Sequence, residues 1–183
     1  GSSDMNVMRQ YYISSRAPIR YPEASVEELL TLIPERSDSP IYDWEPITDG
    51  MEIDLGGRKL KAIHTPGHTD GEMCILDEAS RTLFSGDTAN VGIILMRQPD
   101  NDTKLIKICN ETMKRLWDLQ EAYDRLGVGH DAVTMDKQIV KDYLDLTTGL
   151  LDGSIVGAYE ETGFRKGDVA RLGLAELWYQ CDA

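Results

Sequence analysis

Basic side chains are scarce in this sequence compared with acidic ones. The 183 residues include 19 Lys and Arg against 32 Asp and Glu, which gives a formal net charge of −13 at pH 7. A surface with this excess of negative charge repels the phosphates of nucleic acids and of anionic membranes. We therefore expect neither nucleic acid nor a membrane among the partners of this chain.

Long apolar runs and a cysteine framework are also absent. No stretch approaches the roughly 20 apolar residues that cross a bilayer, and no basic segment followed by an apolar stretch indicates a signal peptide. The cysteines Cys74, Cys109 and Cys181 are odd in number and widely spaced, and no Cys-x-x-Cys pair exists for a zinc ribbon. These absences favour a reducing, cytoplasmic location.

The rest of the composition is that of an ordinary globular chain. Hydrophobic residues make up 41% of the sequence, and a chain of this length buries a real core. Residues 1–3, Gly-Ser-Ser, resemble a cloning remnant. We therefore expect residues 4–183 to form a single domain.

Local patterns in the first part of the chain predict little regular structure. Residues 4–24 carry two prolines and a cluster of tyrosines and are expected to be irregular. Ser-Val-Glu-Glu at residues 25–28 matches a capping box, which predicts a helix over 26–33 that the following proline ends. Residues 35–50 are expected to form a polar connection.

From residue 51 onward the apolar residues alternate with polar ones, which is typical of strands. A hairpin is predicted with strands at 51–55 and 60–64 and a Gly-Gly turn between them. Shorter strands are predicted at 73–76, at 82–85 and at Val128. The apolar run 91–96 is either a strand or a lid-like segment.

Helical spacing returns in the second half of the chain. Residues 102–126 carry one apolar stripe, with Gly127 as the expected C-cap, and a second helix is predicted over about 136–148. Residues 152–163 are expected to be loop. The apolar run 169–179 fits either a strand or a helix, and we favour a strand. This mixture of strands and helices places the chain in the α/β class.

Three residues with metal-binding side chains each follow a predicted strand. His68 comes after a Pro-Gly turn, Asp87 after a buried strand that ends in glycine, and His130 after the short strand at Val128. Strand ends meet at one edge of an α/β sheet, where active sites are built. Each residue alone is more often a surface or turn residue, but imidazole, carboxylate and imidazole together suit zinc, and also iron or manganese.

The motifs around these residues resemble the later motifs of the metallo-β-lactamase superfamily. They are His-Thr-Pro-Gly-His-Thr-Asp-Gly at 64–71, Leu-Phe-Ser-Gly-Asp at 83–87, and Gly-His at 129–130. The resemblance covers about residues 48–145. It implies an αβ/βα sandwich with two metal ions at the sheet edge.

The resemblance also implies a role for each site residue. His68 would ligate one metal, His130 would ligate the other, and Asp87 would bridge both and serve as the catalytic residue that orients the nucleophile. His64 is expected to have a packing role or to support a ligand. Glu72 is either a surface charge, which we favour, or a neighbour of the site.

The family's first motif, His-x-His-x-Asp-His, is missing from this sequence. The chain contains only three histidines, and none precedes His64. The resemblance is therefore to the C-terminal portion of the fold, with the N-terminal portion absent. Because a catalytic zinc needs about three protein ligands, a metal held by the remaining residues is expected to be single, weakly bound or absent.

An incomplete fold of this kind has consequences for assembly. The missing portion would uncover a sheet edge and the apolar faces that it normally covers. A symmetric homodimer hides the same patch twice, so we expect a dimer or a higher oligomer. A stable monomer in light scattering at high micromolar concentration would contradict this expectation.

The resemblance implies a metal-dependent hydrolase that acts on a thioester, a lactone or a related carbonyl compound in the parent protein. For this chain alone we expect weak or no turnover. The alternative is a non-catalytic fragment or assembly module of the same fold without bound metal, and elemental analysis discriminates the two. An oxygen- or NO-reducing di-iron protein is a weaker alternative, and the charge of −13 disfavours a nuclease.

Overall fold

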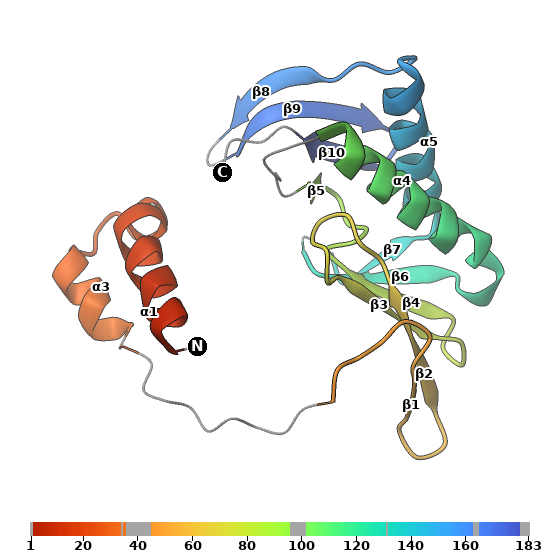
Figure 1. Ribbon diagram of the computed structural model, residues 1–183, viewed down its shortest axis with the longest axis horizontal. Coiled ribbons are helices and arrows are strands. Elements are labelled where there is room, and N and C mark those ends of the chain that lie inside the picture. Colours follow the sequence, from red (N-terminus) through yellow and green to blue (C-terminus); the bar gives the residue numbers. More distant parts are fainter. Residues whose placement is uncertain are drawn as a thin grey trace. The chain divides into compact units, whose positions relative to one another are not determined.

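The computed structural model describes residues 2–33, 35, 45–95, 102–130, 132–162 and 165–179. The chain divides into two compact units, residues 1–45 and residues 46–183, and each is described by itself (Figure 1). Within the described residues, no helix combines the length and the hydrophobicity that crossing a bilayer requires.

The smaller unit is helical. It consists of α1 (Ser2–Tyr11), a wider π-helical segment (Tyr12–Arg16), α2 (Ala17–Arg20) and α3 (Val26–Leu32). The prediction that residues 4–24 are irregular was wrong. Ile13 and Ala17 lie one helical turn apart and pack on Leu29 as a small buried core, and Pro18 falls in the first turn of α2, where proline is tolerated.

The predicted helix after Ser25 is confirmed, together with its capping box. The Glu28 N–H donates to Ser25 Oγ at 3.2 Å, and the Ser25 N–H donates to Glu28 Oε2 at 2.8 Å. Two backbone donors of the first turn are thereby satisfied. In the predicted polar connection, residues 36–44 lie outside the described residues, and residues 45–50 contain no helix or strand.

A six-stranded sheet forms the first layer of the larger unit. Its order is β1-β2-β3-β4-β6-β7. The strands are β1 (Glu52–Asp54), β2 (Lys59–His64), β3 (Met73–Asp77), β4 (Thr82–Gly86), β6 (Arg125–Val128) and β7 (Thr134–Asp136). The predicted hairpin and the strands at 73–76 and 82–85 are confirmed. Gly56 and Gly57 have φ angles of 80° and 103°, which glycine adopts without strain.

The strand directions in this sheet decide where the site lies. β2 is antiparallel to β3, β3 is antiparallel to β4, and β4 is parallel to β6. β2, β4 and β6 therefore run in the same direction, and their C-terminal ends lie at the same edge of the sheet.

A second sheet of four strands has the order β5-β10-β9-β8. Its strands are β5 (Ile93–Ile94), β8 (Ala158–Thr162), β9 (Arg165–Leu172) and β10 (Ala175–Tyr179). Of the two alternatives for 91–96, the strand is found in the described part as β5. A strand rather than a helix is confirmed for 169–179, but the segment holds the end of β9 and the whole of β10 with a turn at 173–174 between them. The loop predicted over 152–163 is found at 153–157 and was wrong at 158–162, where β8 pairs with β9. β8 exposes residues on both faces, so its sequence has no hydrophobic period.

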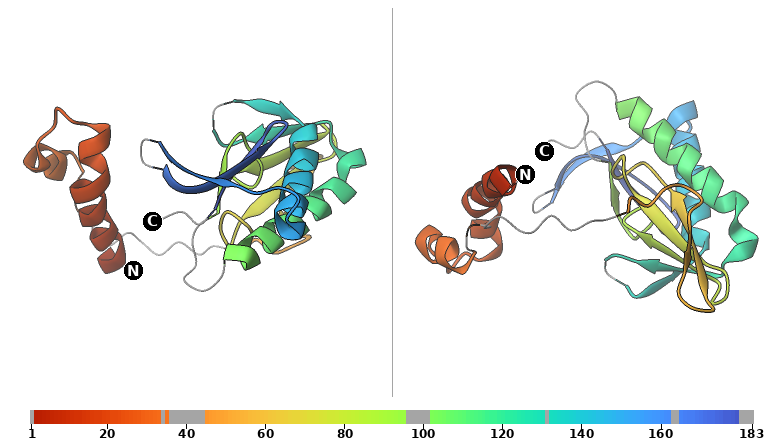
Figure 2. Two further views of the ribbon diagram at one scale, coloured as in Figure 1. Left: turned by 90° about the horizontal axis from the view of Figure 1, so that it is seen from above. Right: turned by 60° about the horizontal axis from the view of Figure 1, so that its bottom comes forward.

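Two long helices, α4 (Asp102–Asp118) and α5 (Gln138–Asp152), lie side by side in the larger unit (Figure 2). Their buried residues form one core with both sheets. The first helix is shorter than predicted: α4 ends at Asp118, a short 3-10 turn (Gln120–Ala122) follows, and Leu126 and Gly127 lie in β6. Gly127 is therefore not a helix cap. The α/β fold class is confirmed.

Candidate metal site at the edge of the six-stranded sheet

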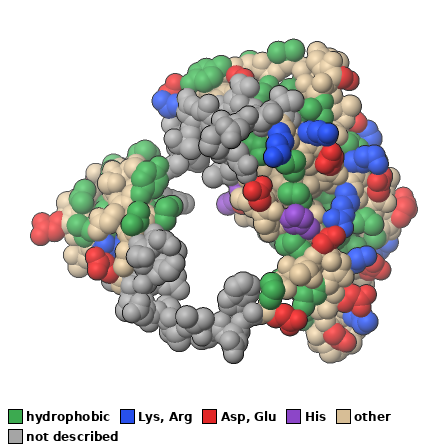
Figure 3. Space-filling view, viewed as in Figure 1, with side chains coloured by type: hydrophobic (Ala, Val, Ile, Leu, Met, Phe, Trp, Pro, Cys, Tyr) green, Lys and Arg blue, Asp and Glu red, His purple; other side chains and the backbone are tan. Residues whose placement is uncertain are grey.

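The structure brings His68, Asp87 and His130 together. They follow β2, β4 and β6, respectively, at the shared edge of the sheet. His68 Nε2 lies 3.9 Å from Asp87 Oδ2, and His130 Nε2 lies 3.2 Å from Asp87 Oδ1. The two imidazoles thus face different oxygens of one carboxylate. On the face drawn in Figure 3, histidine side chains lie at the surface beside both acidic and basic side chains.

The ring of His68 is held from its other side. Its Nδ1 lies 2.6 Å from the carbonyl oxygen of Ile94, and because a carbonyl only accepts, Nδ1 carries the proton. In the neutral ring Nε2 then presents its lone pair toward Asp87. An unprotonated imidazole nitrogen and a carboxylate are donor types that a zinc ion takes, so the side chains at this point fit a bound metal ion by type.

Helix α4 fixes the loop that carries His68. Thr112 Oγ1 donates to the carbonyl oxygen of Pro66 at 2.6 Å, and Gly67 lies against the Cys109 side chain. Burial raises the pKa of the Cys109 thiol to about 12. The Cys109 thiol therefore stays neutral and serves as a packing group. The loop that carries His68 packs against α4 through Pro66 and Gly67.

A buried hydroxyl pair joins the two loops of the site. The hydroxyls of Thr65 and Thr88 lie 3.0 Å apart, and neither side chain is open to solvent. Thr65 precedes the His68 turn and Thr88 directly follows Asp87. This contact links the segments that carry His68 and Asp87 beneath the surface.

Glu72 lies beside the site, and the interpretation of Glu72 as a surface charge was wrong. Its Oε1 accepts a hydrogen bond from the backbone N–H of Asp87 at 3.3 Å, and its Oε2 accepts one from Thr69 Oγ1 at 3.3 Å. Glu72 therefore connects the loop after β2 with the start of the loop after β4. Its position directly before β3 places it at the same sheet edge.

His64 has a supporting role in the loop. Its Nε2 donates to the carbonyl oxygen of Asp70 at 2.8 Å and so closes the 64–70 segment. Its backbone N–H donates to Asp49 Oδ1 at 2.8 Å, and this bond, together with Arg115, holds the pKa of the Asp49 carboxyl below its ordinary value. These contacts tie His64 to its own loop and to Asp49, in agreement with the packing or supporting role expected from the sequence.

The approach of β4 to β6 depends on Gly129. The Gly129 N–H donates to the carbonyl oxygen of Gly86 at 3.0 Å. A Cβ at position 129 would lie 2.8 Å from Asp87 Oδ1 and 3.3 Å from the Gly86 backbone. Only glycine leaves room there for the Asp87 carboxylate.

The pairwise contacts orient metal-binding groups without completing a ligand shell. Within the ranges that the structure describes, no group of three or more His, Cys, Asp or Glu side chains is placed to hold a metal ion. His130 is also the most open of the three side chains, with 67% exposed against 22% for His68 and 34% for Asp87. Each of the two histidines therefore contacts Asp87, but the three side chains do not surround one common point.

Sequence reasoning missed the residues that orient Asp87 and His68. Asn90 Nδ2 donates to Asp87 Oδ1 at 3.1 Å, and the acceptor for His68 is the backbone of Ile94. Asn90 follows Asp87 by three residues, and this short spacing is the sequence feature that could have indicated the contact between the two side chains. A backbone carbonyl has no sequence signal at all.

Over residues 9–150 the chain matches the family model described as the metallo-beta-lactamase superfamily. It is 31% identical over 121 residues to an atrochrysone carboxyl ACP thioesterase of Aspergillus fumigatus, which covers 62% of this chain and 36% of that protein. It is 41% identical over 49 residues to human acyl-coenzyme A thioesterase MBLAC2, which covers 27% of this chain and 18% of that protein.

A solved archaeal metallo-beta-lactamase superfamily protein from Sulfolobus tokodaii matches with 23% identity and a TM-score of 0.46. The match covers 74% of this chain and 50% of that one. The chain thus spans 36% or less of the two curated thioesterases described above.

Proposed function

Because the chain belongs to the metallo-beta-lactamase superfamily, we propose that His68, Asp87 and His130 form part of a metal-dependent hydrolytic site. The observation that carries the proposal is the convergence of two imidazoles on opposite oxygens of one carboxylate at a sheet edge. The relatives that are named thioesterases support a thioester as the substrate class, with lactones as the related alternative.

The chain's own residues have separate tasks in this proposal. His68, Asp87 and His130 would supply the metal ligands, each imidazole paired with its own oxygen of Asp87, with zinc favoured and iron or manganese as alternatives. When bound, zinc supplies an acidified water and polarises a carbonyl group. Asp87 accepts a hydrogen bond from the attacking water and orients it, and the Ile94 carbonyl keeps the His68 ring in its tautomer.

Hydrolysis of an acyl-coenzyme A thioester with added Zn²⁺ tests this function. We expect slow thiol release by the 183-residue chain that depends on the metal and falls about tenfold or more in His68→Ala, since the loss of a ligand weakens the site at least as much as the loss of a ligand's support. Asp118→Ala is the control, because Asp118 is 65% exposed and paired with Lys114 on α4.

Thiol release that is independent of Zn²⁺, or equal in wild type and His68→Ala, would contradict the proposed function. Two tightly held metal ions per chain in elemental analysis would contradict a weak site. No metal uptake and no hydrolysis would overturn the proposal in favour of a non-catalytic assembly module.

We also propose that a second copy of the chain covers the outer face of the six-stranded sheet. Phe84 in the central strand β4 is 47% exposed, although it packs over Gly127 of β6. A single exposed apolar side chain is ordinary on a protein surface, so Phe84 serves as the probe of this face in the test that follows. Light scattering at high micromolar concentration is expected to show a dimer that Phe84→Gln weakens, whereas a wild-type monomer would contradict it.

A further inference from the structure

We propose that Asn90 is a positioning residue of the candidate site, which holds the Asp87 carboxylate with Oδ1 toward His130 and Oδ2 toward His68. This inference rests on the function proposed above. The segment 90–94, which follows Asp87 in the chain, would orient the side chains of Asp87 and His68, on which that function depends.

The side chain of Asn90 is fixed at both ends. It is 4% exposed, its Nδ2 donates to Asp87 Oδ1 at 3.1 Å, and its Oδ1 accepts the Gly92 N–H at 2.9 Å. Because the N–H of Gly92 requires an acceptor, the amide cannot flip without losing both bonds. A hydrogen bond to a carboxylate is stronger than one between neutral groups, so Asn90 restrains the rotation of Asp87.

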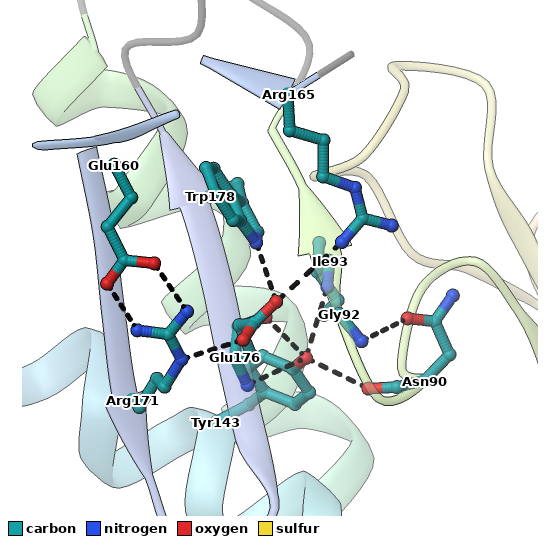
Figure 4. Close-up of polar contacts among 9 residues, drawn as sticks. All are labelled: Asn90, Gly92, Ile93, Tyr143, Glu160, Arg165, Arg171, Glu176 and Trp178. Atoms are coloured by element: carbon teal, nitrogen blue, oxygen red, sulfur yellow. Dashed lines mark hydrogen bonds and ion pairs between the residues drawn. The ribbon is translucent and has the colours of Figure 1, made fainter. Parts of the chain in front are cut away.

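The backbone of the same segment is anchored in the core by Tyr143 (Figure 4). The Tyr143 hydroxyl lies 2.9 Å from the carbonyl oxygen of Asn90 and accepts the Ile93 N–H at 3.1 Å. It also lies 2.8 Å from the carbonyl oxygen of Glu176 in β10. Tyr143 is fully buried on α5, so the segment that carries Asn90 is tied to a helix and to a strand.

The segment 90–94 reaches the site at two points. At its start, Asn90 holds Asp87. At its end, the carbonyl oxygen of Ile94 accepts the Nδ1 proton of His68 at 2.6 Å. One anchored segment therefore orients both the carboxylate and the nearer imidazole, and its side-chain contribution comes from Asn90.

Asn90→Asp removes the donor and adds one negative charge beside Asp87. The substitution keeps the size of the side chain and an acceptor for the Gly92 N–H, but it replaces the N–H donor that faces Asp87 with an oxygen. Asn110→Asp is the matched control: Asn110 lies on α4, and its Nδ2 donates to Thr147 Oγ1 at 3.0 Å and Thr148 Oγ1 at 2.9 Å, away from the site.

The first experiment uses the metal-free chain. In the ¹⁵N–¹H NMR spectrum, the Asn90 side-chain amide signals are expected to shift in Asp87→Ala and to remain in place in Asn110→Asp. Unchanged Asn90 amide signals in Asp87→Ala would overturn the inference, whatever the chain does with metals.

The second experiment titrates the full chain with Co²⁺ and follows its visible absorption. Asn90→Asp is expected to weaken Co²⁺ binding by about tenfold or more and to change the band shape, as loss of a ligand's hydrogen-bond partner does, whereas Asn110→Asp keeps both. Equal binding by wild type and Asn90→Asp would overturn the positioning role while the proposed function stands. No Co²⁺ binding by wild type contradicts the proposed function, and the metal-free NMR result then decides the Asn90 contact alone.

Discussion

Replacing Tyr143 by phenylalanine is expected to lower the free energy of unfolding by about 2 to 4 kcal/mol, although a single oxygen atom is removed. The Tyr143 hydroxyl accepts the backbone N–H groups of Ile93 and Glu176 at 3.1 and 3.3 Å. Ile93 is 1% exposed, so no water replaces the lost acceptor. Burial also raises the pKa of the hydroxyl, which keeps its proton available for a carbonyl oxygen.

Tyr123→Phe is the matched control for this prediction. Tyr123 is as deeply buried as Tyr143, but its hydroxyl donates only to the carbonyl oxygen of Leu116 at 2.9 Å, which also accepts the Leu119 N–H. Its loss is expected to cost about 1 kcal/mol or less. Urea unfolding followed by circular dichroism measures both, and equal losses would show that Tyr143 does not hold the segment 90–94.

Gly129→Ala is expected to disable the site while leaving the fold almost intact. The new Cβ would lie 2.8 Å from Asp87 Oδ1, and the end of a side chain moves more readily than the backbone. The displaced carboxylate would lose its contacts with His130 and Asn90. We expect Zn²⁺ affinity to fall about tenfold to a hundredfold, with a stability loss of about 1 kcal/mol, at the lower end of the cost of overpacking, because the same Cβ also lies 3.3 Å from the Gly86 backbone.

Gly71→Ala tests whether any added methyl group at this edge has the same effect. A Cβ at Gly71 meets nothing within 4 Å, so this variant is expected to bind Zn²⁺ as the wild type does. Competition with a chromogenic chelator gives both affinities. Unaltered affinity in Gly129→Ala would show that the position of Asp87 does not matter for the metal.

The sequence was most informative where a strand end and a reactive side chain coincide. His68, Asp87 and His130 could be selected because each follows a short apolar strand, and parallel strand directions bring such ends to one edge. These residues could be selected without knowledge of the loops between them. Their orientation could not be predicted, because it depends on Asn90 and on the backbone of Ile94. Asn90 is held by Tyr143 of α5, and Ile94 lies in β5, which pairs with β10.

Two of the errors in secondary structure, at residues 119–126 and in β8, have one physical origin. Leu126 is buried in β6, but an apolar residue at that spacing fits a helix stripe as well as a strand, so the predicted helix ran eight residues past Asp118. β8 exposes residues on both faces, so its pairing partner β9 and not its own pattern makes it a strand. In both segments, tertiary contacts and not the local sequence pattern determine the secondary structure.

The three histidines allow the most direct test of the central claim, that His68 and His130 converge on Asp87 while His64 serves the loop. The measurement is a Zn²⁺ titration of the ¹⁵N-labelled chain followed at the histidine ring signals. The account predicts that the His68 and His130 signals shift together with one apparent affinity, that the His64 signal stays in place, and that Asp87→Ala abolishes both shifts. A joint response of all three rings, or a response of His68 and His130 that persists in Asp87→Ala, would contradict it.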